Sequence, residues 1–143
     1  THLPDRAFLG RTSLVSVAFP SSLVIVGDYA FFGCSSLVSI DLPAGLASIG
    51  SGAFERCSAL TNVTFPVGLT SIGRGAFFDC TSLVSIAFPR SLVSIGSFAF
   101  DDCSSLVFID LPASLTSIGV YAIAGCSALA TVTFPAALAS IGS

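Results

Sequence analysis

Every cysteine of this chain lies 23 residues from the next one. The chain has five cysteines among its 143 residues, and they are Cys34, Cys57, Cys80, Cys103 and Cys126. Alanine, proline and glycine each return in a fixed phase of the same period. A fixed period between ~20 and ~50 residues is typical of a solenoid, a propeller or an array, in which each unit stacks on its neighbours. The sequence therefore predicts a repeat protein.

The composition fits a stack in which each repeat buries much of itself. Hydrophobic residues make up 53% of the chain and charged residues 9%, whereas about a quarter of the residues of an ordinary domain are charged. Glycine, proline or serine interrupts every apolar run well before the ~18 residues that a membrane-spanning helix needs. A net charge of −3 without any basic stripe argues against nucleic acid and anionic membrane surfaces as partners.

The repeats extend over the whole chain. Its length suits a single domain, residues 1–143, of about six repeats. Complete arrays end in repeats with a polar outer face, and neither end of this sequence has one. After Gly142 only Ser143 follows, where another Ala-Phe turn is expected. We therefore expect the chain to be a piece of a longer array, which leaves its cellular compartment open.

Each repeat contains two short extended segments. Leu37, Ile40 and Leu42 follow the spacing L-x-x-L-x-L, which in leucine-rich repeats is a short strand and the turn after it. Pro43 then ends the strand, because proline cannot donate a ladder hydrogen bond. The second segment ends at Gly50, where glycine suits either a positive φ or a close approach to the adjacent coil.

A turn completes the repeat. In residues 52–57, Phe54 and Cys57 lie three positions apart, as on one face of a single helical turn. These elements predict an α/β solenoid that is mostly β. We expect a right-handed leucine-rich-repeat stack with one parallel β-sheet, and short helical or irregular turns opposite it.

The repeated string resembles the BspA-type leucine-rich repeat. The string is L-x-S-I-G-x-x-A-F-x-x-C-S-x-L-x-x-I-x-L/F-P, and it stands at residues 46–66, 69–89 and 92–112. The resemblance covers essentially the whole chain, with departures such as Arg11 in place of the first cysteine and Ile123 in place of the sixth phenylalanine. It implies a role in adhesion and protein binding, as in surface proteins of microbes and protists.

The cysteines are interpreted as a ladder of buried free thiols, which act as small hydrophobic side chains. Disulfide bonds between adjacent coils are an alternative, although an odd number of cysteines leaves one unpaired. A metal site is a further alternative, but it needs about four clustered ligands, and His2 is the only histidine. We therefore predict no cofactor and no metal.

The inventory of side chains argues against catalysis. A nucleophilic triad needs a base, and His2 is the single histidine of the chain. Asp41 and Asp110 share a strand phase, but three strand spacings of ~4.8 Å place them roughly 14 Å apart, too far for an acid–base pair. Asp101 and Asp102 are interpreted as a solvated turn. We predict that the chain is not an enzyme.

The outward positions of the first extended segment are candidate binding residues. The sheet face of a solenoid is its usual binding surface. Here that face is small and polar, and Phe108 is its one large side chain. The candidates on this face are Ser39, Asp41, Asn62, Thr64, Ser85, Phe108, Asp110, Thr131 and Thr133.

A second set of candidates consists of aromatic residues in one phase. Tyr29, Phe98 and Tyr121 stand where other repeats carry Gly52 and Gly75. Each ring either folds over the adjacent coil or belongs to a protein-binding patch. Phe98 and Tyr121 occupy adjacent repeats, so their backbones are predicted to lie roughly 5 Å apart and their rings to touch.

Two functions remain in competition. The first is a non-catalytic protein-interaction or adhesion module, which the resemblance places at the cell surface or outside the cell. The second is a structural subunit that uses exposed aromatic side chains as contacts in a larger multiprotein assembly, with an intracellular complex as the alternative location. Both functions require a protein partner.

Overall fold

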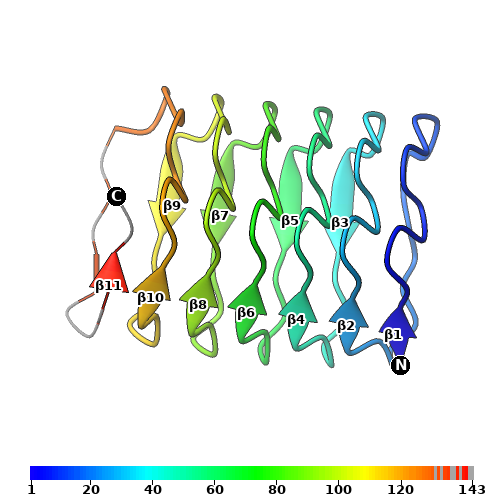
Figure 1. Ribbon diagram of the computed structural model, residues 1–143, viewed down its shortest axis with the longest axis horizontal. Helices are drawn as coiled ribbons and strands as arrows, with labels where there is room; N and C mark the ends of the chain where they lie inside the picture. The colour runs from blue at the N-terminus through cyan, green and yellow to red at the C-terminus, as the bar shows by residue number, and fades with distance from the viewer. Residues whose placement is uncertain (131, 133, 136–137, 139, 142–143) are drawn as a thin grey trace.

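The chain winds into a stack of nearly identical coils in the computed structural model (Figure 1). The structure describes residues 1–130, 132, 134–135, 138 and 140–141. Partners in adjacent coils lie 23 residues apart, as Ser48 and Ser71 do. The register of the sequence repeat is therefore also the register of hydrogen bonding between coils.

The second extended segment of each repeat forms one continuous parallel sheet, which confirms the predicted parallel β-solenoid. Its seven strands pair in sequence order. They are β1 (His2–Leu3), β2 (Ile25–Val26), β4 (Ser48–Ile49), β6 (Ser71–Ile72), β8 (Ser94–Ile95), β10 (Ser117–Ile118) and β11 (Ser140–Ile141). The ladder continues into the glycine that follows each of β2, β4, β6, β8 and β10, as in the hydrogen bond from the Gly73 amide to the Ile49 carbonyl, 2.8 Å long.

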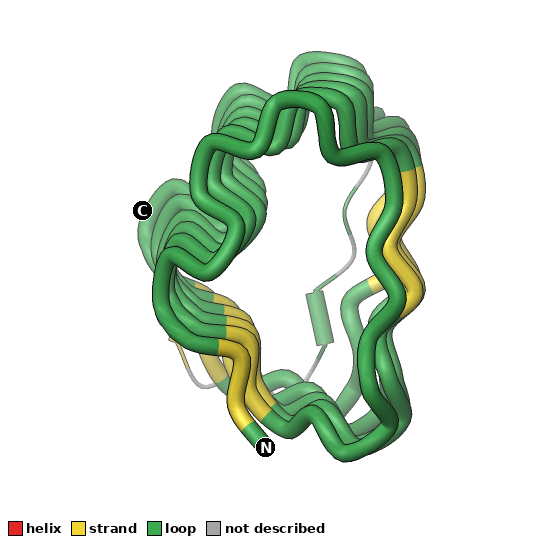
Figure 2. Tube along the Cα trace, turned by 90° about the vertical axis from the view of Figure 1, so that its right-hand side faces the viewer, coloured by secondary structure: helices red, strands yellow, loops and turns green. Residues whose placement is uncertain are grey.

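The L-x-x-L-x-L segments form two further, two-stranded sheets on another side of the coil, so the expectation of a single sheet is corrected to one continuous sheet and two short ones among the described residues. Their strands are β3 (Ser39–Asp41), β5 (Asn62–Thr64), β7 (Ser85–Ala87) and β9 (Phe108–Asp110). β3 pairs with β5 and β7 pairs with β9, both in parallel. Viewed along the stack, the two columns of strands lie on different sides of an oval cross-section (Figure 2).

None of the described residues is helical, so the turns are irregular rather than helical. The reason lies in alternating hydrogen bonds. The amides of Ala53, Glu55 and Cys57 donate to carbonyls three residues back in their own coil. The amides between them, those of Gly52, Phe54 and Arg56, donate to the next coil over 2.7–2.8 Å. Half of the amides that would donate within a helix therefore donate to the neighbouring coil instead.

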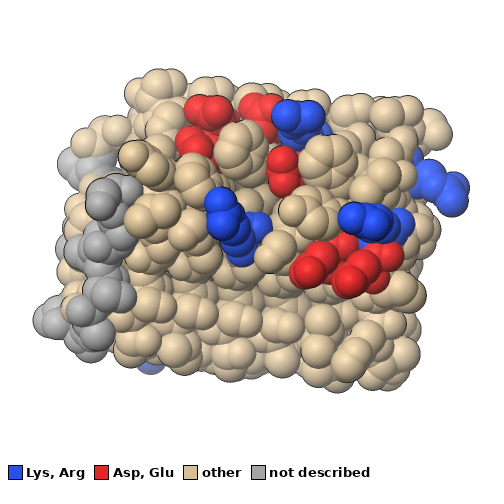
Figure 3. Space-filling model, viewed as in Figure 1, with Lys and Arg blue, Asp and Glu red and all other residues tan. Residues whose placement is uncertain are grey.

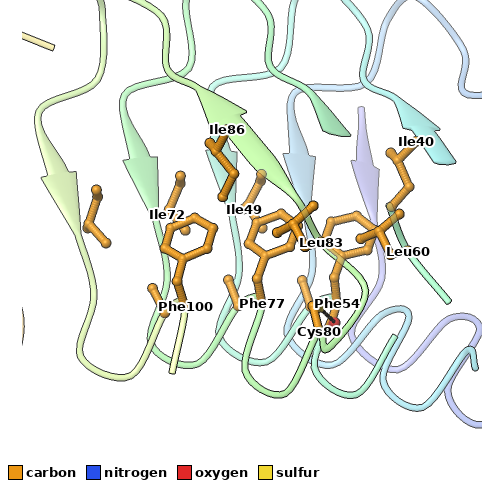
Figure 4. Close-up of a cluster of buried hydrophobic side chains, with 14 of the residues drawn as sticks. Ile40, Ile49, Phe54, Leu60, Ile72, Phe77, Cys80, Leu83, Ile86 and Phe100 are labelled. Atoms are coloured by element: carbon orange, nitrogen blue, oxygen red, sulfur yellow. Dashed lines mark hydrogen bonds between the residues drawn. The ribbon is translucent and has the colours of Figure 1, made fainter. Parts of the chain in front are cut away.

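A column of phenylalanine rings fills the centre of the stack. The rings of Phe8, Phe31, Phe54, Phe77 and Phe100 stack with centroids 5.1–5.2 Å apart and planes within 14° of parallel. Figure 4 shows three of them, one from each of three successive coils, among buried isoleucines and leucines. Stacked rings thus add an apolar contact to the backbone hydrogen bonds between successive coils.

The cysteines line the same core and are all free, which confirms the interpretation as buried thiols. Each thiol donates to a phenylalanine carbonyl of the preceding coil, as Cys57 Sγ does to Phe31 O over 3.2 Å. Burial raises the pKa of the Cys57 thiol to about 12 and that of Cys126 to about 11. The thiols are therefore protonated at neutral pH and poor nucleophiles.

Candidate functional site

The charged residues gather on one side of the molecule. We call this side the turn face and define it by six equivalent segments: residues 5–10, 28–33, 51–56, 74–79, 97–102 and 120–125. Nine of the thirteen charged residues of the chain belong to these segments. Figure 3 shows arginines and acidic residues grouped in a band on this side, surrounded by uncharged surface. The turn face is thus the part of the surface with the most varied chemistry.

The aromatic candidates stand on this face because of their backbone conformation. Every repeat has a left-handed residue at the same position of the turn. These residues and their φ values are Arg6 (59°), Tyr29 (56°), Gly52 (61°), Gly75 (62°), Phe98 (60°) and Tyr121 (55°). The side chains in this phase are solvent-accessible: Tyr29 is 37% exposed and Tyr121 53% exposed, while Phe98 is half-buried.

The rings of Phe98 and Tyr121 touch, as the sequence predicted. Their centroids are 5.5 Å apart, with planes inclined by 30°. The guanidinium carbon of Arg74 lies 5.3 Å from the centroid of Phe98. This separation lies within the range of a cation–π interaction. A guanidinium and two rings thus form one ordered cluster on the surface.

The ring of Tyr29 both packs on the adjacent coil and remains accessible at the surface. A Cβ atom on Gly52 would collide with the Tyr29 ring, so this ring lies over the adjacent coil. It is nevertheless more than a third exposed. Folding over the neighbouring coil and being available at the surface therefore do not exclude each other at this position.

A groove of about 490 Å³ opens where the row of rings is interrupted. Gly75 lies in it, with Phe98 and Arg74 on one side and Tyr29 on the other. Phe78, Glu55 and Ser51 complete the lining. The groove therefore combines aromatic surfaces with one carboxylate and one guanidinium.

The carboxylate of Glu55 is half-buried in this groove. Desolvation raises its pKa, the positive charge of Arg56 lowers it, and the negative charge of Asp79 raises it. Within the described part of the chain, no hydrogen bond reaches this carboxylate. Glu55 is thus a hydrogen-bond acceptor that is open to a ligand.

The candidates of the first extended segment form a separate surface, which we call the strand face. It consists of the outward residues of β3, β5, β7 and β9. Its exposed candidates are Ser39, Asp41, Asn62, Thr64, Ser85, Phe108 and Asp110. The central residue of each strand, such as Ile86, points inward. Thr131 and Thr133 lie outside the described residues.

The structure thus divides the sequence candidates into two surfaces. Tyr29, Phe98 and Tyr121 stand on the turn face, and the other described candidates stand on the strand face, at a different part of the coil cross-section (Figure 2). Glu55 and Arg74 were not among the residues predicted from the sequence. The available signal was that both residues stand at positions where the repeats do not agree, Arg74 directly before the aromatic phase and Glu55 three residues after it.

Metal binding and membrane spanning find no support in the described part of the chain. No group of three or more histidine, cysteine, aspartate or glutamate side chains lies in a metal-binding arrangement there. The same residues include no helix with the length and apolar character to cross a membrane.

Known structures share this fold. A leucine rich repeat protein of T. pallidum is 40% identical with a TM-score of 0.87, and the match covers 90% of this chain and 60% of that one. A leucine rich cell surface protein of Faecalibacterium prausnitzii is 34% identical with a TM-score of 0.77, over 80% of this chain and 30% of that one. This chain spans less than two thirds of either protein.

A third relative matches the whole length of this chain. A leucine-rich repeat protein of Eubacterium ventriosum superimposes with a TM-score of 0.88 at 26% identity, over 100% of this chain and 41% of that one. No curated protein sequence matches. The profile of the BspA type leucine rich repeat region matches residues 1–73 and 47–143, in six copies. The chain therefore belongs to the BspA-type leucine-rich repeat family.

Proposed function

We propose that this chain is a non-catalytic protein-interaction or adhesion module and that its partner docks on the turn face. The observation that carries this proposal is the ordered cluster of Arg74, Phe98 and Tyr121 on the surface. Tyrosine and arginine are enriched among the residues that contribute most to the energy of protein interfaces. The stacked coils hold these side chains in place, so little conformational entropy is lost when a partner binds.

The relatives support a location at the cell surface. The protein of Faecalibacterium prausnitzii, 34% identical to this chain, is a cell surface protein. Adhesion modules at a surface meet their partners from the side, and an elongated stack presents its side as a long continuous face. The turn face runs along the whole described stack, which suits such a contact.

A second candidate function is that of a structural subunit in a larger assembly. The observation in its favour is a column of exposed valines next to the strand face. Val15, Val38, Val84 and Val107 share one phase and are 44–57% exposed, and Phe108 beside them is 56% exposed. A permanent subunit would cover this apolar column together with the residues of the strand face, whereas an adhesion module would use the turn face.

A photo-crosslinking experiment separates the two functions. Benzoylphenylalanine replaces Tyr121 in one variant and Ser85 in the other, and each variant is expressed and irradiated in its source cells. Adducts from position 121 to a protein outside the producing cell support the adhesion module. A single adduct of fixed stoichiometry from position 85, with none from position 121, would reject the turn face and support the structural subunit.

Once a partner is purified, its affinity provides a second test. Phe98→Ser is expected to weaken binding at least tenfold, since interface anchors contribute about 2 kcal/mol or more. Phe108→Ser on the strand face is the matched control, because it removes an exposed ring of the same type from the other surface. Equal affinities of the two variants would contradict docking on the turn face.

A further inference from the structure

We propose that the groove over Gly75 is a binding slot for a tyrosine side chain of the partner protein. This inference rests on the proposed function and names the chemistry of its contact. The slot is the place where the row of surface rings is interrupted, and it contains a free acceptor.

The slot is vacant because of glycine, and it has room for a ring. Gly75 has the same left-handed backbone as Phe98, with φ values of 62° and 60°. A Cβ atom at Gly75 would meet only Glu55 Oε2 at 3.7 Å and Phe78 Cβ at 3.9 Å, which are ordinary contacts. The backbone at this position thus accepts a side chain, as Phe98 demonstrates one coil further, but the chain leaves the space open.

Gly52 provides the contrast within the same phase. There the space for a side chain is taken by the Tyr29 ring, whose carbons would collide with an added Cβ. Of the two glycines that interrupt the row of rings, only Gly75 therefore has room for a Cβ atom without a clash, although its own backbone is buried. The groove of about 490 Å³ has Gly75 and Phe78 in its lining, so an incoming ring would meet apolar surface.

The charges of the slot select a neutral ring that carries a hydrogen-bond donor. A cationic side chain would be attracted by Glu55 but repelled by Arg74. An anionic side chain would be attracted by Arg74 but repelled by Glu55. A phenol avoids both penalties. Its ring packs on Phe98 and Phe78, and its hydroxyl donates to the open carboxylate of Glu55. A hydrogen bond with one charged partner is stronger than one between neutral groups.

The experiment uses peptide probes on the whole chain. Acetyl-Gly-Tyr-Gly-amide is titrated into the ¹⁵N-labelled protein while the amide signals of Gly75 and Phe78 are followed. We expect saturable shifts with a dissociation constant of about 1 mM, the range that a single small side chain reaches. The peptide with O-methyltyrosine keeps the ring but lacks the donor, and we expect it to bind about tenfold more weakly.

Two substitutions at one position test the site itself. Gly75→Phe places a ring in the slot and is expected to abolish binding of the tyrosine peptide. Gly75→Ala introduces the same backbone strain but leaves the slot open, so its affinity should stay within about twofold of the wild type. The amide spectra of both variants show whether the solenoid remains folded.

Several results would overturn the proposal. They are the absence of saturable shifts in the wild type, equal affinities for tyrosine and O-methyltyrosine peptides, and undiminished binding to Gly75→Phe. Tighter binding of methyl β-glucoside than of the tyrosine peptide would assign the slot to a sugar instead. If Gly75→Phe binds the protein partner normally while Phe98→Ser does not, the turn face remains the docking surface and the tyrosine slot is rejected.

Discussion

Phe77 and Phe78 are neighbours in the chain, but they belong to two regions with different constraints. Phe77 is completely buried, and its phase is phenylalanine in all but the last of the six copies. Phe78 is half-buried on the turn face. The residues in its phase are Leu9, Phe32, Glu55, Phe78, Asp101 and Ala124. One step along the backbone therefore separates a position that is apolar in every copy from one that varies in size, polarity and charge.

The difference follows from what each side chain contacts. The ring of Phe77 lies between the rings of Phe54 and Phe100, 5.2 Å from each. A smaller side chain there would leave a void against two coils at once. A side chain on the turn face contacts its neighbours on one side only and water on the other. The interior thus constrains the residue type strongly, whereas the turn face leaves the residue type free to vary.

The largest expected effect comes from breaking the central column of rings. Phe77→Ala should lower the free energy of unfolding by about 3–5 kcal/mol, since it removes a fully buried ring and leaves a cavity. The matched control is Phe78→Ala, where a half-buried ring is removed one residue away and the loss should be about 1 kcal/mol or less. Urea unfolding followed by circular dichroism measures both. Similar losses would contradict the distinction between interior and turn face.

Two glycines two residues apart sharpen the same comparison. Gly73 does not have a left-handed φ; a Cβ atom there would lie 2.6 Å from the carbonyl carbon of Gly50, so glycine is required by the close approach of the coils. Gly73→Ala should cost about 3 kcal/mol, because backbone atoms of the preceding coil must move. In Gly75→Ala the added Cβ atom makes no clash, so the substitution should cost only about 1 kcal/mol for an alanine at positive φ. A reversed order of thermal midpoints would show that φ, not proximity, governs these positions.

The architecture could be predicted from the sequence because the repeats carry the same information several times. The period, the free thiols, the parallel stacking and the contact of Phe98 with Tyr121 all follow from phase alone. The conformation of the turns does not, since the spacing of Phe54 and Cys57 fits a helical turn as well as the alternating hydrogen bonds that are found. The sequence left two explanations for a glycine in the phase of Gly73, a positive φ or a close approach to the adjacent coil. Only the short distance to Gly50 decides in favour of the close approach.

The candidate site was less predictable because it depends on positions where the repeats disagree. The phase identified Tyr29, Phe98 and Tyr121, yet it gave no reason to join them to Arg74 or Glu55. Those contacts depend on the direction in which long side chains lean across adjacent coils, which a repeat pattern does not encode. The vacancy over Gly75 likewise depends on the Tyr29 ring, which covers Gly52 and not Gly75.

The buried thiols predict a smaller, pH-dependent effect in the interior. Burial raises the pKa of Cys57 to about 12 from an ordinary value of 9.0. The unfolded chain therefore releases this proton at a lower pH than the folded chain. Stability is unaffected below pH 9 and falls as the pH rises from 9 towards 12, by about 1 kcal/mol for this thiol at pH 10.

The Cys57→Ala variant isolates that contribution. Its free energy of unfolding is lower at pH 7 because a packed atom is lost, but it should decrease less steeply than that of the wild type between pH 9 and pH 10. Thiol titration at pH 8 provides a second measurement, with few reactive groups in the folded protein and five after denaturation. Five fast-reacting thiols in the folded state would be incompatible with their burial.

The smallest effect on stability is expected on the turn face, at the contact of Phe98 with Tyr121. A double-mutant cycle with Phe98→Ser and Tyr121→Ser should give a coupling energy of about 0.5 kcal/mol, the lower end for aromatic pairs, because Tyr121 is half exposed to water. A small coupling would agree with the proposed role of these rings in binding rather than in folding. Removal of both rings should correspondingly reduce the binding of a hydrophobic dye and leave the thermal midpoint within a few degrees of the wild type. A coupling above about 2 kcal/mol, or a large loss of stability, would mean that the pair is a continuation of the core, and the division between the two regions would fail at this point.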